Sequence, residues 1–311
     1  RHPWSGTAFL VIAGTFLLGQ AVPAVQTYPE ALTVTTGPFW SDAMEWINVN
    51  FFDTFEAAKT VVLTWVLLPV KQFFGGIPWG WGIVATGLIA WRVGGWPLGL
   101  LAMLLSGFIA ASGLWGKAMV TVYLCGVSVV IATLIGIPLG ILAAERPRAG
   151  RVILGLMDTL QTLPSFVYLI PVVMLFRVGD FSAMIAVILY ALAPAVRYAA
   201  HGVRDVPEPL LEAGRMAGCT RAQLLWRIKL PLATPQLLLG LNQTIMLALS
   251  MLVITALVGT RDLGQEVYIA LTKANAGQGI VAGLGVACIA IIADRIVNAL
   301  AEGQRKRLGL A

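Results

Sequence analysis

Long apolar runs recur along most of this chain, and they restrict its fold more than any other feature. They lie near residues 8–24, 77–91, 96–113, 117–144, 152–176, 181–200, 235–259 and 279–299. Their lengths suit helices that cross the ~30 Å hydrocarbon core of a bilayer, and the alternating ~10-residue strands of a membrane barrel do not occur. Only 12% of the 311 residues are charged, against roughly 25% in an ordinary soluble domain. The sequence therefore predicts an all-α, polytopic helical membrane protein with about eight transmembrane helices.

The basic residues predict how these helices are oriented. They gather in the connection at 146–151, in the segment 201–233 and in the final stretch at 305–307. If every predicted helix crosses once, all three groups lie on the same side, which the positive-inside rule makes cytoplasmic. Topology thus accounts for the net charge of +6, and nucleic acid is not expected as a partner.

Two N-terminal features leave alternatives open. The run at 8–24 is predicted to be a first span, although a cleavable signal peptide fits the same residues. Residues 44–74 mix acids, lysines and aromatics, which favours a helix lying in the membrane interface over one that crosses. We therefore divide the chain into an N-terminal part at 1–76, two accessory transmembrane helices in 77–116, and a core in 117–311.

Metal and disulfide chemistry is not indicated. Cys125, Cys219 and Cys288 are far apart along the chain, and His2 and His201 are isolated. Neither a disulfide framework nor a metal site follows from this arrangement.

The segment 201–233 is more elaborate than a simple connection requires. Pro207 breaks the preceding helix, Gly218 suits a tight left-handed turn, and Thr220 suits an N-cap. The sequence therefore predicts two short helices about Gly218, with Pro231 stopping the second before the next span. That second helix has an apolar face opposite charged residues, and the face consists of Leu224, Leu225 and Ile228.

The spacing within this segment resembles the EAA signature of bacterial ABC importer permeases. The matching positions are Glu212, Ala213, Gly218, Ile228, Leu230 and Pro231. Gly214 departs from the signature, whose third position is usually alanine, and it weakens the first short helix. Three further stretches resemble the glycine betaine, proline betaine and choline branch of that family. They read DTLQTLPSFVYLIP at 158–171, YALAPAVRY at 190–198 and LNQTIMLALSMLVITALVG at 241–259. The resemblance covers about 117–299 and fades before about residue 75.

The resemblance implies a fold and a working arrangement. It implies a five-helix, type I, MetI-like permease core in 117–311, located in a bacterial inner membrane. In that family two permease copies form the pathway, two cytoplasmic ATPases bind ATP and Mg, and a periplasmic binding protein delivers substrate. The loop at 201–233 then seats on the ATPase, with Glu212 holding the loop or meeting a basic group and Leu224, Leu225 and Ile228 packing. For these residues alone, an amphipathic loop resting on anionic lipid headgroups is the alternative.

The implied substrate is a small quaternary ammonium or methylated amine compound. Glycine betaine, proline betaine, choline, carnitine and trimethylamine N-oxide all remain open. No G-x-x-x-x-G-K-S/T phosphate-binding loop is present, so we expect this chain to be no enzyme and to hold no cofactor of its own. A secondary betaine or choline carrier, which works without an ATPase, is the competing function, although no internal repeat of the kind such carriers contain is evident.

Polar residues inside the predicted spans are candidates for the translocation pathway, because such groups avoid lipid. They are Asp158, Gln161, Pro164 and Tyr168 in one span, and Asn242, Gln243, Met246 and Ser250 in another. The first span contains prolines and is expected to kink. Interhelical hydrogen bonding is the alternative role for Asn242, Gln243 and Ser250. Asp158 has the alternative role of a partner for the cytoplasmic arginines.

The external loop at 260–278 is a candidate docking surface for the binding protein. It contains Arg261, Asp262, Glu266 and Lys273, and Gly264 and Gly277 are expected to form its turns. As a bare connection, the same charges would simply be solvated.

Overall fold

The computed structural model describes residues 3–21 and 30–309, and within those ranges the chain is almost entirely helical and contains no strand. This confirms the all-α fold class. The chain separates into two units, one ending at Asn50 and the other beginning at Phe51, and each is described by itself.

The first unit consists of α1 (Pro3–Ala21), a short turn η1 (Glu30–Leu32) and the start of α3 (Gly37–Val62). Helix α1 is apolar and largely exposed. It takes in most of the predicted span at 8–24, whose last three residues lie outside the described residues. The choice between a retained span and a signal peptide stays a prediction.

The second unit is a helical bundle built around one buried helix. Its long members are α7 (Trp115–Glu145), α8 (Pro147–Thr162), α9 (Ser165–Phe176), α10 (Asp180–Arg204), α13 (Leu230–Thr255) and α15 (Ala276–Arg307). Helix α10 lies at the centre, packed between α7 and α13, and more than half of its residues are buried. Small residues allow this close packing, since a Cβ added to Gly140 of α7 would lie 2.5 Å from the carbonyl oxygen of Val196 in α10.

Most of the predicted spans correspond to long helices. Five helices of the described chain are long and apolar enough to cross a membrane, and the predicted runs at 117–144, 181–200, 235–259 and 279–299 fall on four of them. The predicted run at 152–176 is a sixth candidate, formed by α8 and α9 with a bend of 98° between them. The bend lies at Leu163 and Pro164, so the kink predicted for this span is confirmed.

The predicted spans at 77–91 and 96–113 fold as a helical hairpin. Helices α5 (Trp79–Gly94) and α6 (Trp96–Ala111) have 16 residues each and are joined at Gly95, which has a φ of 83°. Each is about 24 Å long, shorter than the usual transmembrane helix. The Trp115 indole N–H donates to the carbonyl oxygen of Ile77 at 3.1 Å, which holds the start of the hairpin against α7.

The segment that we expected at the interface is part of a longer helix. Helix α3 continues through a π-helical turn, η2 (Leu63–Leu67), into α4 (Leu68–Gly75), and the 39 residues from Gly37 to Gly75 meet the length and composition of a span. The interfacial placement of 44–74 therefore stays a prediction. Lys71 forms an ion pair of 2.7 Å with Asp180 of α10, and the Tyr123 hydroxyl of α7 donates to the same carboxylate. These contacts fix α4 to the bundle.

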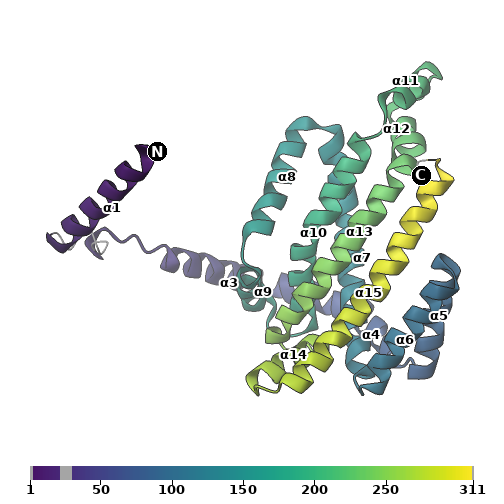
Figure 1. Ribbon diagram of the computed structural model, residues 1–311, viewed down its shortest axis with the longest axis horizontal. Coiled ribbons are helices and arrows are strands. Elements are labelled where there is room, and N and C mark those ends of the chain that lie inside the picture. The colour runs from purple at the N-terminus through teal and green to yellow at the C-terminus, as the bar shows by residue number, and fades with distance from the viewer. Residues whose placement is uncertain (1–2, 22–29, 310–311) are drawn as a thin grey trace. The chain divides into compact units, whose positions relative to one another are not determined.

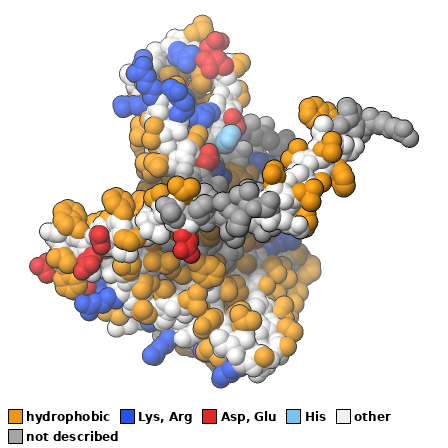
Figure 2. Space-filling model, turned by 90° about the vertical axis from the view of Figure 1, so that its left-hand side faces the viewer, with side chains coloured by type: hydrophobic (Ala, Val, Ile, Leu, Met, Phe, Trp, Pro, Cys, Tyr) orange, Lys and Arg blue, Asp and Glu red, His pale blue; other side chains and the backbone are white. Residues whose placement is uncertain are grey.

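The two ends of the bundle differ in charge. Helices α11 (Glu208–Met216) and α12 (Arg221–Leu224) lie at one end together with the C-terminal end of α15, and α14 (Leu263–Thr272) lies at the other (Figure 1). Figure 2 shows Lys and Arg side chains gathered at the first of these ends and hydrophobic side chains over much of the remaining surface. The positive-inside rule places the basic end on the cytoplasmic side.

Candidate functional site

The elbow, residues 208–229, consists of a short helix, α11, joined at a glycine to the first turns of a longer helix that runs from Arg221 to Val258. Helix α11 ends in a left-handed residue, Gly218, with a φ of 80°. The Gly218 N–H donates to the Arg215 carbonyl at 2.9 Å, and the Cys219 N–H donates to the Gly214 carbonyl at 3.0 Å. This pair of bonds is the Schellman motif, which satisfies the last carbonyls of a helix. The turn predicted at Gly218 is therefore present.

The second half of the elbow begins with a capping box. The Gln223 N–H donates to the Thr220 hydroxyl oxygen at 3.3 Å, and the Thr220 N–H donates to the Gln223 side-chain oxygen at 2.8 Å. Such reciprocal bonds satisfy two donors at a helix start and fix the entry of the chain. Helix α12 then continues through a π-helical turn, η3 (Leu225–Lys229), into α13, so that one helix runs from Arg221 to Val258. The expectation that Pro231 stops the second helix before the next span is therefore wrong, because the chain takes up the proline through the π-helical turn that precedes it. The elbow is consequently a structured unit at both sides of its hinge.

Gly214 explains how the two helices of the elbow meet. A Cβ at this buried position would lie 2.5 Å from Cδ1 of Ile228 and 2.8 Å from Cδ2 of Leu224. Leu224 is only 8% exposed, and Leu225 and Ile228 are partly buried. Leu224 and Ile228, which the sequence assigned to an outside partner, thus pack against α11. The departure from the EAA signature at Gly214 makes room for them.

The apolar side chains that the elbow exposes are different ones. Met216 is 89% exposed and Trp226 is 68% exposed. Glu212 and Ala213 are exposed as well, whereas Leu230 and Pro231 form the first turn of α13. Sequence reasoning did not single out Met216 or Trp226, because periodicity identifies an apolar face without saying which helix covers it.

An ion pair joins the elbow to α7, and a hydrogen bond joins the end of α10 to the same helix. Lys229 forms an ion pair of 2.5 Å with Glu145 at the end of α7. The Arg204 guanidinium, at the end of α10, donates to the carbonyl oxygen of Ala143 at 2.6 Å. The elbow also connects α10 directly to α13, two helices that pack against each other in the bundle. The elbow is therefore attached to the helices at the centre of the bundle.

The candidates in α8 and α9 contact α10. Asp158 forms an ion pair of 2.6 Å with Arg197, and the Gln161 amide donates to the Tyr190 carbonyl oxygen at 3.4 Å. The Tyr168 ring packs edge-on against the Tyr190 ring with 6.3 Å between centroids. Asp158 therefore has an arginine partner, but this arginine belongs to α10 and not to the cytoplasmic connection. Arg197 and Tyr190 were not among the predicted site residues.

Pro164 is exposed and lies at the bend between α8 and α9. Its ring fixes the backbone φ and its nitrogen carries no proton, so it cannot continue the hydrogen-bonding pattern of α8. The bend thus follows from the local sequence.

The candidates in α13 have two kinds of surroundings. Asn242 is buried, and its amide donates at 2.7 Å to Asp294 of α15, which also accepts from Asn298 at 2.9 Å. This is the interhelical hydrogen bond that was the alternative role for Asn242. Gln243 and Ser250 are exposed and Met246 is partly buried, with the Ser250 hydroxyl donating to the Met246 carbonyl.

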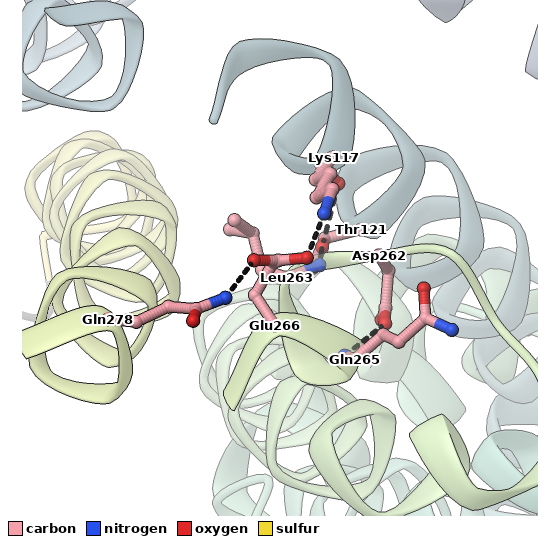
Figure 3. A network of polar contacts seen from close by, with 7 residues as sticks. All are labelled: Lys117, Thr121, Asp262, Leu263, Gln265, Glu266 and Gln278. Atoms are coloured by element: carbon pink, nitrogen blue, oxygen red, sulfur yellow. Dashed lines mark hydrogen bonds and ion pairs between the residues drawn. The ribbon is translucent and has the colours of Figure 1, made fainter. Parts of the chain in front are cut away.

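The external end is organised by a buried carboxylate. Lys117 at the start of α7 donates to Glu266 of α14, and the Gln278 amide of α15 donates to the same carboxylate at 2.7 Å (Figure 3). The Leu263 N–H donates to the Thr121 hydroxyl at 3.0 Å. Helix α7 is thereby joined at one point to α14 and α15, which lie far from it in the sequence.

The external loop exposes only part of its charge. Arg261 and Lys273 are exposed, whereas Asp262 and Glu266 are buried, so these two acids do not offer the docking surface that the sequence indicated. The expected turns at Gly264 and Gly277 are wrong, since both lie within helices. The chain turns instead at Gly259, with a φ of 81°, and at Ala274, with a φ of 50°. Close packing against the backbone of α13 explains why residue 264 is glycine, because a Cβ there would lie 2.7 Å from the Leu252 carbonyl oxygen.

Asp262 is the N-cap of α14 and carries a shifted pKa. Burial raises the pKa of its carboxyl to about 6, and the nearby Asp180 carboxylate adds to the rise. Hydrogen bonds to one carboxylate oxygen from the Gln265 N–H at 3.1 Å and the Thr260 hydroxyl at 3.2 Å oppose it. The second oxygen is buried and has no hydrogen-bond partner in the described residues. The folded protein therefore favours the protonated form more than the unfolded chain does.

Stability at the external end is accordingly expected to fall as the pH rises. Between the unfolded pKa of about 4 and the folded pKa of about 6, the folded state binds more protons, so the free energy of unfolding decreases and then levels off. The full loss is at most about 3 kcal/mol. Asp262→Asn keeps the cap and cannot ionise, so it should flatten this dependence. Hydrogen exchange of the α14 amides from about pH 4.5 to about pH 7.5 measures it. Glu302→Gln, at an exposed position, is the control and should keep the wild-type pH dependence. An unchanged pH dependence in Asp262→Asn would contradict its assignment to Asp262.

The chain is similar to known proteins both in its sequence and in its fold. The family model for the binding-protein-dependent transport system inner membrane component matches residues 136–306. The trimethylamine N-oxide transport system permease protein TmoV of Pelagibacter ubique is 41% identical over 283 residues, covering 91% of this chain and 40% of that protein. The similarity thus continues well before residue 75, where the resemblance was expected to fade.

Two further proteins complete the comparison. The glycine betaine/proline betaine transport system permease protein ProW of Escherichia coli is 37% identical, with 86% of this chain and 75% of that protein covered. The MetNI methionine ABC transporter, solved in inward facing conformations, aligns with a TM-score of 0.56 at 20% identity, covering 60% of this chain and 94% of the matched one. This structural likeness concerns the fold. The chain spans less than half the length of the Pelagibacter relative and three quarters of that of ProW.

Proposed function

Because the chain belongs to the family of binding-protein-dependent transport system inner membrane components, we propose that it is the permease subunit of an ATP-driven importer. Its cargo is a small quaternary ammonium or methylated amine compound, carried across the inner membrane into the cytoplasm. The observation that carries this proposal is the elbow, a rigidly capped pair of helices at the basic end of the bundle. A passive connection between two spans needs neither its caps nor its hinge.

The elbow seats on a separate ATPase subunit, which binds the ATP and Mg. Met216 and Trp226 supply the exposed apolar contacts, and Glu212 supplies an exposed charge beside them. Leu224 and Ile228 keep the two helices of the elbow together, so that the elbow moves as one body. Closure of the ATPases then tilts α10 and α13 through their direct connections to the elbow.

A second copy of this chain completes the pathway. The exposed faces of α8 and α13 carry Asp158, Gln243 and Ser250 at positions within the spanning part of the helices. Polar groups at such depth avoid lipid and face another protein or a water-filled cavity. A periplasmic binding protein delivers substrate at the external end, where Arg261 and Lys273 are the exposed charges of the loop.

The substrate class rests on the relatives. TmoV is a permease of a trimethylamine N-oxide system and ProW one of a glycine betaine/proline betaine system. All three compounds carry a fully substituted nitrogen, and we assign the same substrate class to this chain. A secondary carrier for betaine or choline is the second candidate, and it is disfavoured because such a carrier has no use for a cytoplasmic elbow that seats on an ATPase.

Uptake into proteoliposomes that contain the permease, its ATPase and its binding protein tests the proposal. Wild-type vesicles should accumulate a methylated amine only with internal ATP. Glu212→Ala should lower uptake by about tenfold, the effect of one lost charge-assisted contact, while the protein still inserts. Glu302→Ala, at an exposed acid on the same end of the bundle, is the control and should leave uptake unchanged. ATP-independent uptake driven by an ion gradient would establish the secondary carrier instead.

A further inference from the structure

An ion pair lies at a depth where charge is costly. Helix α8 begins at Pro147 and α10 ends at Arg204, so Asp158 lies about 16 Å from the cytoplasmic end of α8 and Arg197 about 10 Å from that of α10. The Asp158 side chain is 68% exposed and the Arg197 side chain 38% exposed. Charged groups exposed at spanning depth face a water-filled cavity or another protein and not lipid. The pair therefore belongs to a surface that lines a passage or meets the second copy.

Aromatic side chains extend the contact of α8 and α9 with α10 toward the external end of the bundle. Tyr190 lies two helical turns before Arg197, on the same face of α10. Its backbone oxygen accepts from Gln161, and its ring packs edge-on against Tyr168. Tyr168 is 5% exposed, and its hydroxyl is buried without a hydrogen-bond partner in the described part of the chain. A buried hydroxyl left unpaired costs free energy, so hydrogen bonding does not explain the position of Tyr168 beside Tyr190.

We propose that Asp158 and Arg197, with Tyr190 and Tyr168 beside them, form a passage site selective for methylated zwitterions. This inference rests on the proposed function and deepens it. A substrate carboxylate or N-oxide oxygen is held by the Arg197 guanidinium, whose planar donors match such oxygens. The methylated ammonium group has no proton to donate, and it is held by the Asp158 charge and by the ring of Tyr190, which is only partly buried.

The ion pair also explains how the two charges of the site are neutralised when no substrate is bound. With no substrate, each charge satisfies the other at 2.6 Å, so the passage carries no unpaired charge. A zwitterion offers one group of each sign and replaces both halves of the pair at once. A simple cation such as choline satisfies Asp158 and leaves the Arg197 guanidinium without the partner that it has in the empty site. The site therefore discriminates by charge pattern and not by size.

A purely structural ion pair behaves differently when it is removed. Removing one partner of such a pair leaves an uncompensated charge, whereas replacing both by neutral groups of similar shape is often harmless. The double variant Asp158→Asn with Arg197→Gln therefore separates the two roles. It should recover transport if the pair only holds α8 to α10, and it should remain defective if the pair binds substrate.

The test uses the reconstituted importer with glycine betaine and trimethylamine N-oxide as zwitterionic probes and choline as the cationic probe. Arg197→Gln should lower uptake of whichever zwitterion the wild type carries by at least about tenfold. ATP hydrolysis stimulated by the loaded binding protein should stay within about twofold of wild type, because the elbow is intact. The double variant should show the same defect. Arg295→Gln, at an exposed arginine of α15, is the matched control and should transport normally.

Three results would overturn the site. They are recovery of zwitterion uptake in the double variant, equal loss of uptake and stimulated ATP hydrolysis in Arg197→Gln, and a wild type that carries choline but neither zwitterion. A wild type that carries none of the three probes with ATP contradicts the proposed function itself, and the passage site fails with it.

Discussion

Replacing Gly140 by leucine is expected to prevent the bundle from closing. A Cβ at this position of α7 would lie 2.5 Å from both the Val196 carbonyl oxygen and the Ala199 Cβ of α10. Neither is the end of a flexible side chain, so the two helices would have to separate along their whole contact. Overpacking a well-packed core costs about 1–3 kcal/mol, and a leucine against backbone atoms belongs at or above the upper end of that range.

The fraction of protein that elutes as a folded species in mild detergent measures this effect. Gly126→Ala is the matched control on the same helix, because a Cβ there meets nothing within 4 Å. That variant should be as stable as wild type or up to about 1 kcal/mol more stable, since alanine favours helix over glycine. Equal yields and thermal stabilities for Gly140→Leu and wild type would contradict the packing of α7 against α10.

Replacing Gly218 by valine is expected to abolish transport while leaving the bundle folded. The left-handed conformation at this position, with a φ of 80°, costs an L-residue about 1–2 kcal/mol and a β-branched residue more. The Schellman motif would open and the direction of α12 relative to α11 would change. Uptake and stimulated ATP hydrolysis should therefore fall together, as measured in proteoliposomes.

Gly214→Ala is the matched control for this loss. It also adds a side chain to the elbow, but the atoms that it would meet are the ends of the flexible side chains Ile228 and Leu224. Those ends can rotate away, and alanine gains up to about 1 kcal/mol in helix propensity. Gly214→Ala should keep most of the uptake. If both variants transport equally well, the hinge at Gly218 has no mechanical role.

Much of the fold follows from local sequence. Apolar runs located the long spans, and the prolines of α8 and α9 located their break. The elbow was equally accessible, because Gly218 and Thr220 act through their own backbone neighbours and need no distant partner. Features of this kind are determined by a few neighbouring residues, so they can be predicted without knowing how the helices pack.

The remaining features depend on which helices meet. Periodicity identified the apolar face of α12, but it could not show that this face packs against α11 at Gly214 and leaves Met216 and Trp226 outside. Arg197 was missed because its partner, Asp158, lies 39 positions earlier in the sequence and on a different helix. Gly264 looked like a loop residue and is instead a point of close helix packing.

The central claim is that the elbow binds a separate ATPase subunit. Co-purification of that ATPase with the permease tests this claim most directly. Met216→Glu, alone or with Trp226→Glu, places charge on the exposed apolar contacts of the elbow. Leu271→Glu is the matched control, since Leu271 is a 76% exposed apolar residue of α14 at the opposite end of the bundle. The account predicts that wild type and Leu271→Glu retain the ATPase and that the elbow variants lose it. Retention by the elbow variants, or loss only in Leu271→Glu, would contradict it.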